Sequence, residues 1–236
     1  GKKVYVTVNI FAHNEDIAEL PEYLLSLEKA GVDALLISDF GVWNIARQVV
    51  PAMPLHVSTQ ANTCNWAAAE AWKNLGAERV VLARELSIAE ISEIGKKCDV
   101  ELEVFVHGAM CISYSGRCYL SSYLTGRDGN RGECAQVCRW NYKLVEQNRP
   151  DQEFSIEEDE RGTYIMNSKD LCLLDLIPEL AEAGVDSLKI EGRMKSVHYV
   201  ATVVSVYRKA IDAWYSNPDE FVVKSEWKDE LEKVSH

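Results

Sequence analysis

The stretch Glu28–Ile37, which reads EKAGVDALLI, indicates the fold class of this chain because it recurs as Ala181–Ile190, AEAGVDSLKI. Leu75–Leu82, LGAERVVL, is a looser third copy. Each copy runs from the end of a helical segment through a glycine and a short turn into an apolar strand. This is the repeating unit of β/α barrels. The repeat therefore predicts an α/β chain with a TIM-like β/α barrel, which we favour over an open sheet.

Outside these copies, short apolar runs alternate with segments of helical period. The predicted strands are Val4–Ile10, Ala34–Asp39, Leu55–Thr59, Arg79–Ala83, Leu102–His107, Tyr164–Asn167 and Ser187–Glu191. The predicted helices are Asp16–Lys29, Val42–Val50, Trp66–Leu75, Ile88–Lys97, Leu173–Glu182 and Val197–Tyr215. Most of the strands are nearly continuous in apolar residues, as expected where helices cover a sheet or a barrel closes.

One segment, residues 111–168, interrupts this alternation and holds most of the cysteines. We predict a Cys-rich β-hairpin insertion, with strands at Tyr142–Glu146 and Thr163–Met166 around an acidic loop, Gln147–Glu160. Long insertions between barrel strands usually serve function. The partial barrel, insertion included, is predicted to span residues 1–216, and residues 217–236 form a charged tail.

Composition excludes several classes of protein. The chain is 47% hydrophobic and 26% charged, so a sizeable core can form. Its longest apolar runs, such as Ala34–Ile37 and Val80–Ala83, are too short to cross a bilayer, so we expect no membrane partner. Seven cysteines, an odd number, and an N-terminal segment, Val4–Val8, that resembles a strand rather than a signal peptide argue against a secreted disulfide scaffold. We expect a cytoplasmic protein.

The distribution of charge leaves a nucleic-acid partner open. The net charge is −12, which usually disfavours nucleic acid. Between Cys111 and Arg149, however, six basic residues stand against three acidic ones. A basic island of this kind can still bind phosphate locally.

Five cysteines lie close together, at Cys111-x6-Cys118-x15-Cys134-x3-Cys138 and at Cys172. Thiolates bind zinc and iron–sulfur clusters. Structural zinc sites usually contain two short Cys-x2-4-Cys pairs, and this segment has one close pair. The irregular spacing favours an iron–sulfur cluster gathered from several loops, with zinc or buried free thiols as alternatives. Cys64 and Cys98 lie outside the group.

A second interpretation of the cysteines is a nucleophile, Cys111, activated by His107. It is the weaker interpretation because such sites need no neighbouring thiols and no third orienting group is evident.

Polar residues recur where the predicted strands end: Asn9, Asp39, Gln60, Arg84, His107 and Glu191. In a β/α barrel these ends share the face on which active sites lie. We therefore expect a polar mouth at this face.

The longest motif of the chain, Glu103–Ser121 (EVFVHGAMCISYSGRCYLS), resembles the signature of collagenase-like proteins grouped as family 32 of peptidases of unknown type. Gly132–Trp140, Tyr164–Leu171 and Lys189–Ser196 extend the resemblance over essentially the whole chain.

Within that family the chain is most similar to the tRNA hydroxylation protein P branch. The resemblance implies a tRNA-modifying enzyme that makes 5-hydroxyuridine at the wobble position, with prephenate as co-substrate. Sister branches hydroxylate a cytidine of ribosomal RNA or act in oxygen-independent ubiquinone synthesis. The implied cofactor is a 4Fe–4S cluster on Cys111, Cys118, Cys134 and a fourth ligand, Cys138 or Cys172. Its role would be redox or Lewis-acid activation of an oxygen donor, and an electron donor is a further expected partner.

The resemblance also implies an incomplete barrel. Relatives carry two further β/α units before the first strand of this chain and continue beyond its last residue. We therefore expect about six parallel strands, and an open edge through which copies of the chain associate as a homo-oligomer.

Several charged residues are candidates for catalysis or binding. As catalytic groups we predict His107, Arg117, Glu191 and Arg193, and as cofactor-binding groups Arg139 and Lys189. Arginines bind carboxylate or phosphate bidentately, and His107 could act as acid or base; surface ion pairs and a structural histidine are the alternatives. Lys189 and Glu191 alternate along a strand, so we expect only one of them to face the interior.

Trp140 and Tyr114 are candidates for stacking on a flipped base, or for packing beneath the cluster loop. Two other functions stay open. One is a collagenase-like peptidase, although the chain has no His-Glu-x-x-His or Gly-x-Ser-x-Gly motif. The other is a zinc-stabilised, non-catalytic RNA-binding module.

Overall fold

The computed structural model describes residues 1–111, 113–140, 144–146, 149–154, 158–159, 162–163 and 170–234. Six parallel strands form a curled sheet in the order β1 (Tyr5–Val8), β2 (Ala34–Ile37), β3 (Leu55–Val57), β4 (Arg79–Val81), β5 (Glu101–Gly108) and β11 (Ser187–Glu191). A short strand, β10 (Leu171–Cys172), pairs antiparallel with the end of β5. The sheet is half of a barrel, which confirms the predicted incomplete TIM-like fold.

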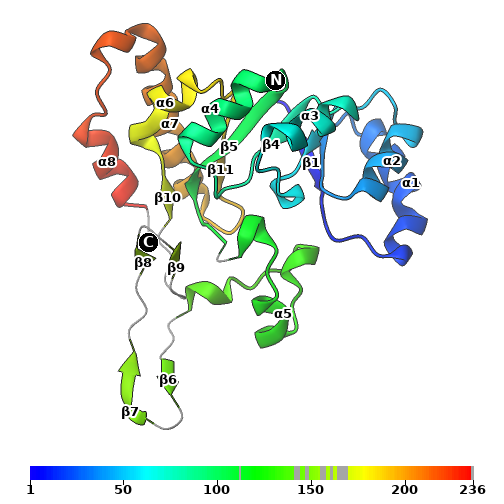
Figure 1. The fold of residues 1–236 in the computed structure, drawn as a ribbon, viewed down its shortest axis with the longest axis horizontal. Coiled ribbons are helices and arrows are strands. Elements are labelled where there is room, and N and C mark those ends of the chain that lie inside the picture. Colours follow the sequence, from blue (N-terminus) through cyan, green and yellow to red (C-terminus); the bar gives the residue numbers. More distant parts are fainter. Residues whose placement is uncertain are drawn as a thin grey trace.

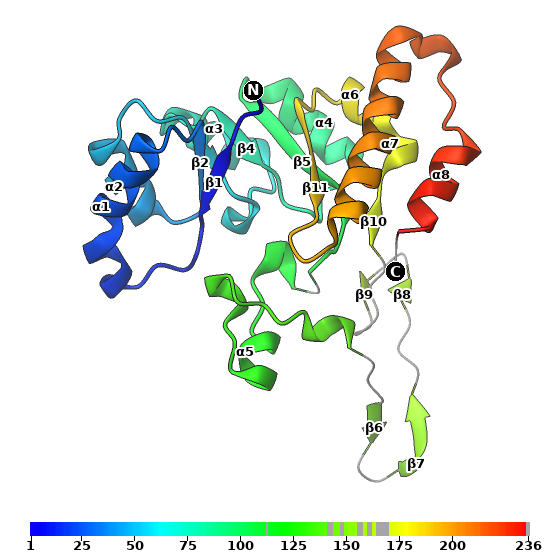
Figure 2. The ribbon, with the colours of Figure 1, turned by 180° about the vertical axis from the view of Figure 1, so that it is seen from behind.

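Helices cover the outer side of the sheet, and the insertion lies beyond the carboxyl ends of the strands (Figures 1 and 2). The helices are α1 (Asn14–Lys29), α2 (Phe40–Val49), α3 (Trp66–Asn74), α4 (Ile88–Lys97), α5 (Leu120–Thr125), α6 (Ile177–Glu182), α7 (Val197–Ser216) and α8 (Ser225–Glu232). No helix in the described ranges is long and apolar enough to cross a membrane.

The three repeat joints have the same backbone structure. Gly31, Gly76 and Gly184 all have positive φ, between +76° and +86°. In each joint the residue after the glycine donates its N–H to a carbonyl five residues earlier, at 3.0 to 3.3 Å. This is the hydrogen bond of a Schellman motif, which ends a helix and turns the chain back toward the sheet. The sequence repeat is therefore a structural repeat.

The two faces of the sheet pack against different neighbours. Along β2, Leu35 and Ile37 contact the helices, whereas Leu36 points to the inner side. There Leu36 packs with Val81 and Phe105 from other strands. Alternate residues of a strand point to opposite faces. Burial on both faces explains why the predicted strands lacked a clear apolar–polar alternation.

A β-bulge in β5 changes the direction of its last side chains. Lys189 pairs with Phe105 but the next residue, Ile190, pairs with His107, so Val106 is the extra residue. A bulge of this kind re-aims the side chains that follow it. His107 therefore points to the outer side, against Tyr207 of α7, and not into the half-barrel.

The insertion differs from the predicted hairpin. β6 (Leu144–Glu146) pairs with β7 (Arg149–Phe154), and β8 (Glu158–Asp159) with β9 (Gly162–Thr163). The predicted loop 147–160 was therefore wrong where it covers β7 and β8, because pairing with β6 and β9 overrides a polar composition that disfavours strands. The predicted strand Tyr164–Asn167 lies outside the described residues.

At the other end of the chain, α8 packs on α7 and buries Trp227 and Leu231. The division of the chain at residue 216 stays a prediction, as does association through the open barrel edge.

Gly108 is the last residue of β5, and its backbone conformation is unfavourable for any other residue type. Its φ is +104°, and a Cβ atom there would collide with the carbonyl oxygen of Glu191. We expect Gly108→Ala to lower the free energy of unfolding by about 2 to 4 kcal/mol, because backbone strain and overpacking add. Gly31→Ala is the matched control, since its φ is also positive but the space around it is open. It should cost about 1 kcal/mol. Equal losses in urea unfolding would contradict the collision.

Candidate active site at the mouth of the half-barrel

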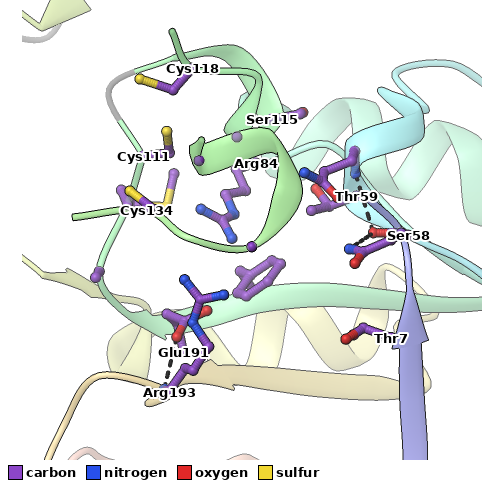
Figure 3. Close-up of a pocket in the computed structure, with 18 of the residues that line it drawn as sticks. Thr7, Ser58, Thr59, Arg84, Cys111, Ser115, Cys118, Cys134, Glu191 and Arg193 are labelled. Atoms are coloured by element: carbon purple, nitrogen blue, oxygen red, sulfur yellow. Dashed lines mark hydrogen bonds between the residues drawn. The ribbon is translucent and has the colours of Figure 1, made fainter. Parts of the chain in front are cut away.

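A cavity of about 350 Å³ lies at the carboxyl ends of the strands, under the insertion (Figure 3). Its polar and charged lining comprises Thr7, Asn9, Ser58, Thr59, Gln60, Arg84, Ser115, Asn130, Gln136, Arg139, Lys189, Glu191 and Arg193, with Cys111, Cys118, Cys134 and Cys138. Strand ends and insertion loops contribute together. Of the predicted polar mouth, Asn9, Gln60, Arg84 and Glu191 line the cavity, together with cysteines. Asp39 does not: its carboxylate caps α2 by accepting from the Val42 N–H, and His107 also lies outside.

Four cysteine side chains line this one cavity. Cys111, Cys118 and Cys134 lie on the same side of it in Figure 3. Backbone N–H groups donate to two of the sulfurs, Leu120 to Cys118 and Gln136 to Cys134, both at 3.3 Å. Donors of this kind stabilise thiolates.

Cys111 is buried near other ionisable groups of the cavity. Burial first, and then the charges of Cys118 and Cys138, raise the pKa of its thiol to about 11, although the Ser113 backbone and Arg84 act in the opposite direction. A bound cation removes this penalty, because coordinating thiols lose their protons to the metal. The donor set thus fits a thiolate-held metal group. In the described residues, no three His, Cys, Asp or Glu side chains converge as they would around a single ion.

Cys172 stands in a different place from the other four. It is exposed on β10, opposite His107 in the strand register, and the Tyr207 hydroxyl lies 4.0 Å from its sulfur. It is not among the residues that line the cavity. The two alternatives for a fourth ligand, Cys138 and Cys172, therefore differ in position.

Arg84 lines the cavity, although the sequence predicted it only as one of the polar residues at the strand ends. It follows β4, and its guanidinium lies over the ring of Phe105, 3.9 Å from the centroid. Its Nε is buried with no hydrogen-bond partner among the described residues. Burial lowers the pKa of Arg84, and the charge of Glu191 acts in the opposite direction. Its position directly after a strand was the only signal in the sequence.

Both Lys189 and Glu191 line the cavity, so the expectation that only one would face inward was wrong. Residues two apart on a strand share a face. Lys189 Nζ is 2.8 Å from Glu103 Oε1, deeper in the half-barrel. Glu191 accepts a hydrogen bond from the backbone N–H of Arg193 at 2.9 Å.

Glu103 forms the buried end of an ion-pair network. Its carboxylate, 7% exposed, contacts Arg79 at 3.2 Å and Lys189 at 2.8 Å, and accepts a hydrogen bond from Ser187. Burial alone would raise its pKa, but Lys189, Ser187 and Arg79 together hold the pKa below its ordinary value.

A second buried carboxylate, Asp170, ties the insertion to the barrel. It contacts Arg139 at 3.0 Å and Lys195 at 2.9 Å, and the Tyr199 hydroxyl donates to it at 2.9 Å. Arg139 also lines the cavity. Asp170 therefore connects a wall of the cavity to α7.

Two of the four predicted catalytic residues, Arg117 and His107, also lie outside the cavity. Arg117 is exposed and donates twice to the carbonyl oxygen of Gln60, at 3.1 and 2.8 Å. His107 is 2% exposed, and burial lowers its pKa. Its Nδ1 lies 3.4 Å from the Tyr207 hydroxyl, and its Nε2 has no partner within the described part. Their predicted catalytic roles stay predictions, without a place in this cavity.

A curled parallel sheet with a thiol- and arginine-lined mouth defines an α/β half-barrel protein whose site lies at the strand carboxyl ends, as in barrel enzymes. The model of the family described as Peptidase family U32 matches residues 1–236. The chain belongs to this family, which confirms the resemblance inferred from its motifs.

The chain is similar to curated proteins whose names refer to the hydroxylation of RNA. The chain is 50% identical to tRNA hydroxylation protein P1 of Bacillus subtilis (strain 168), over 100% of this chain and 56% of the relative. It is 43% identical to tRNA hydroxylation protein P of Escherichia coli (strain K12), over 90% of this chain and 56% of that protein. The E. coli 23S rRNA 5-hydroxycytidine C2501 synthase is 36% identical over 90% of this chain and 31% of its own length.

The chain thus spans about half the length of the tRNA hydroxylation relatives it matches. Among solved structures, that of the U32 peptidase Mk0906 aligns with 81% of this chain and 70% of its own, with a TM-score of 0.46 and 16% identity.

Proposed function

We propose that this chain carries the cofactor- and substrate-binding half-barrel of a tRNA hydroxylase that makes 5-hydroxyuridine at the wobble position, with prephenate as co-substrate. The names of its relatives support an RNA-modifying enzyme. The observation that supports the proposal most is a single cavity lined by four cysteines and by an arginine whose Nε lacks a partner in the described part. A tRNA substrate implies a cytoplasmic setting.

Cys111, Cys118 and Cys134, with either Cys138 or Cys172, would hold a 4Fe–4S cluster. Such a cluster supplies electron transfer or Lewis-acid activation of an oxygen donor, and a redox role requires an electron-donor partner. The chain's own contribution is to gather the thiolates at the barrel mouth and to direct backbone N–H groups at two sulfurs.

The other wall of the cavity would hold the co-substrate. Prephenate carries two carboxylates, and guanidinium groups bind carboxylates bidentately. Arg84 and Arg193 line the cavity, and Glu191 is the one acidic side chain among the described residues that line it. Hydroxyls of Thr7 and Ser58 on the far side would orient the rest of the ligand.

Replacing Arg84 tests this role. We expect Arg84→Met to weaken prephenate binding by about thirtyfold, because a charged hydrogen bond contributes about 2 kcal/mol. Arg84→Lys should recover only part of it, since an ammonium lacks the fork. Calorimetric titration of prephenate measures the dissociation constant. Arg208→Met, on the exposed side of α7, is the control. Unchanged binding in Arg84→Met would exclude this role.

The proposed function is tested by purifying the chain without oxygen and quantifying iron, sulfide and zinc. The protein is then incubated with unmodified tRNA, prephenate and a reductant. About four irons and four sulfides per chain, with 5-hydroxyuridine in the digested tRNA, would support the proposal. Stoichiometric zinc that iron reconstitution does not displace, with tRNA bound but unmodified, would favour the zinc-stabilised module. Gelatin cleavage that Cys111→Ser abolishes would favour the peptidase.

A further inference from the structure

The insertion carries two unusually exposed aromatic side chains. Tyr119 is 80% exposed and Tyr123 84%, the highest values for aromatic residues in the described ranges. The N–H of Tyr123 donates to the carbonyl of Tyr119 at 2.9 Å, so the two stand one helical turn apart. Residues at this spacing share a helix face. Tyr119 is the N-cap of α5 and Tyr123 lies within the helix, so two neighbouring rings are exposed to solvent there.

The backbone beneath these rings is held in place by buried polar contacts. Ser121, fully buried between the two tyrosines in sequence, donates to the carbonyl of Arg127 at 2.8 Å and accepts from the N–H of Ala135 at 3.0 Å. Thr125 donates back to the carbonyl of Ser121 at 2.7 Å. The rings are therefore presented on a preorganised base, which lowers the entropic cost of binding.

The two rings belong to a basic segment of the chain. Arg127 follows α5 closely in sequence and is exposed, whereas Arg117, before α5, is held by the carbonyl oxygen of Gln60. The segment is rich in basic residues within a chain of net charge −12. An apolar protein partner would require a larger contiguous apolar patch than these two tyrosines with Leu124, which α5 also exposes. Exposed aromatic rings in a basic segment instead match an unpaired nucleic-acid strand, whose bases stack while its phosphates pair with cations.

The segment that carries the rings is joined to the proposed active site through the backbone. Tyr119 directly follows Cys118, which lines the cavity, and the N–H of Leu120 donates to the Cys118 sulfur.

We propose that Tyr119 and Tyr123 form a stacking platform for two unpaired bases of the RNA substrate, with Arg127 pairing with a flanking phosphate. This inference rests on the proposed tRNA substrate and adds the surface that binds it. The platform binds single-stranded loop nucleotides and does not bind base-paired stems.

The test measures binding of a fluorescent anticodon stem–loop to the anaerobically purified protein, with iron content recorded for every variant. Tyr119→Ala and Tyr123→Ala should each weaken binding by about tenfold. The Phe variants should bind like the parent protein, since stacking needs only the ring. Tyr215→Ala is the matched control, because Tyr215 is 70% exposed at the far end of α7.

Salt dependence separates the two kinds of contact. Arg127→Gln should reduce the slope of log affinity against log salt by about 0.7, the value for one phosphate contact on a single strand. The tyrosine variants should keep the slope of the parent protein. A fully paired RNA duplex should compete poorly with the stem–loop.

Parent-like binding by both alanine variants, with their iron content intact, would overturn the platform and leave the proposed function standing. Failure of the iron-loaded parent protein to bind tRNA would overturn both the platform and the proposed function. A change of oligomeric state in the alanine variants, without loss of RNA affinity, would assign the rings to a protein interface instead and overturn the proposal.

Discussion

Cys111→Ser is expected to lose essentially all of the iron–sulfur cluster and all hydroxylation of tRNA. A serine hydroxyl is a poor ligand for iron where a thiolate is required. The visible absorption of the anaerobic protein and its iron and sulfide content measure the loss. Cys118→Ser and Cys134→Ser should behave in the same way.

The fourth ligand is identified by comparing Cys138→Ser with Cys172→Ser. We expect one of them to lose the cluster and the other to keep it, because a 4Fe–4S cluster takes four thiolates. Cys64→Ser is the control, since Cys64 does not line the cavity. Full iron content in both variants would contradict the proposed ligand set.

Glu103→Ala is expected to lower the free energy of unfolding by about 3 to 5 kcal/mol. It removes the partner that Arg79 and Lys189 share inside the half-barrel, and an uncompensated buried charge is strongly destabilising. Glu101→Ala is the matched control, because Glu101 also pairs with Arg79 but is 52% exposed. An exposed pair contributes about 0 to 1 kcal/mol. Urea unfolding measures both, and equal losses would contradict a special role for burial.

The same carboxylate predicts a pH dependence. The folded pKa of Glu103 lies below its ordinary value, so the unfolded chain binds its proton more tightly than the folded chain does. The stabilisation from Glu103 is therefore complete above about pH 5 and is lost as the pH falls toward the folded pKa. Glu103→Gln should lose less stability than the parent protein between about pH 5 and about pH 3. If both proteins lost the same stability over this pH range, Glu103 would not be the source of the pH dependence.

Much of the fold was predictable because its signals are local. The helix Ile88–Lys97 was predicted at its observed bounds: the Ser87 hydroxyl and the Glu90 carboxylate cap its first turn, and lysines close its last. The glycine joints were recognisable for the same reason, since a Schellman motif is made within a few residues. Cys111, Cys118, Cys134 and the residues after the strand ends also stood out by type and spacing.

Other features depended on contacts between distant segments. A single extra residue in β5 turns His107 away from the mouth, and its register is set only by pairing with β11. Arg84 became a site residue because Phe105, from another strand, lies beneath its guanidinium. The pairing of β6 with β7 was missed because strand propensity depends on the partner strand.

The sequence by itself determined the class of fold, the family and a group of five candidate cysteines, of which four line the cavity. These features follow from repeats and motifs whose residues are close together in the sequence. Only the tertiary structure decided which of the charged residues share the cavity, that Lys189 and Glu191 both face it, and that Cys138 and Cys172 occupy different places. The direction of a side chain at a strand end depends on bulges and packing partners far away in the chain, and residue type does not encode it.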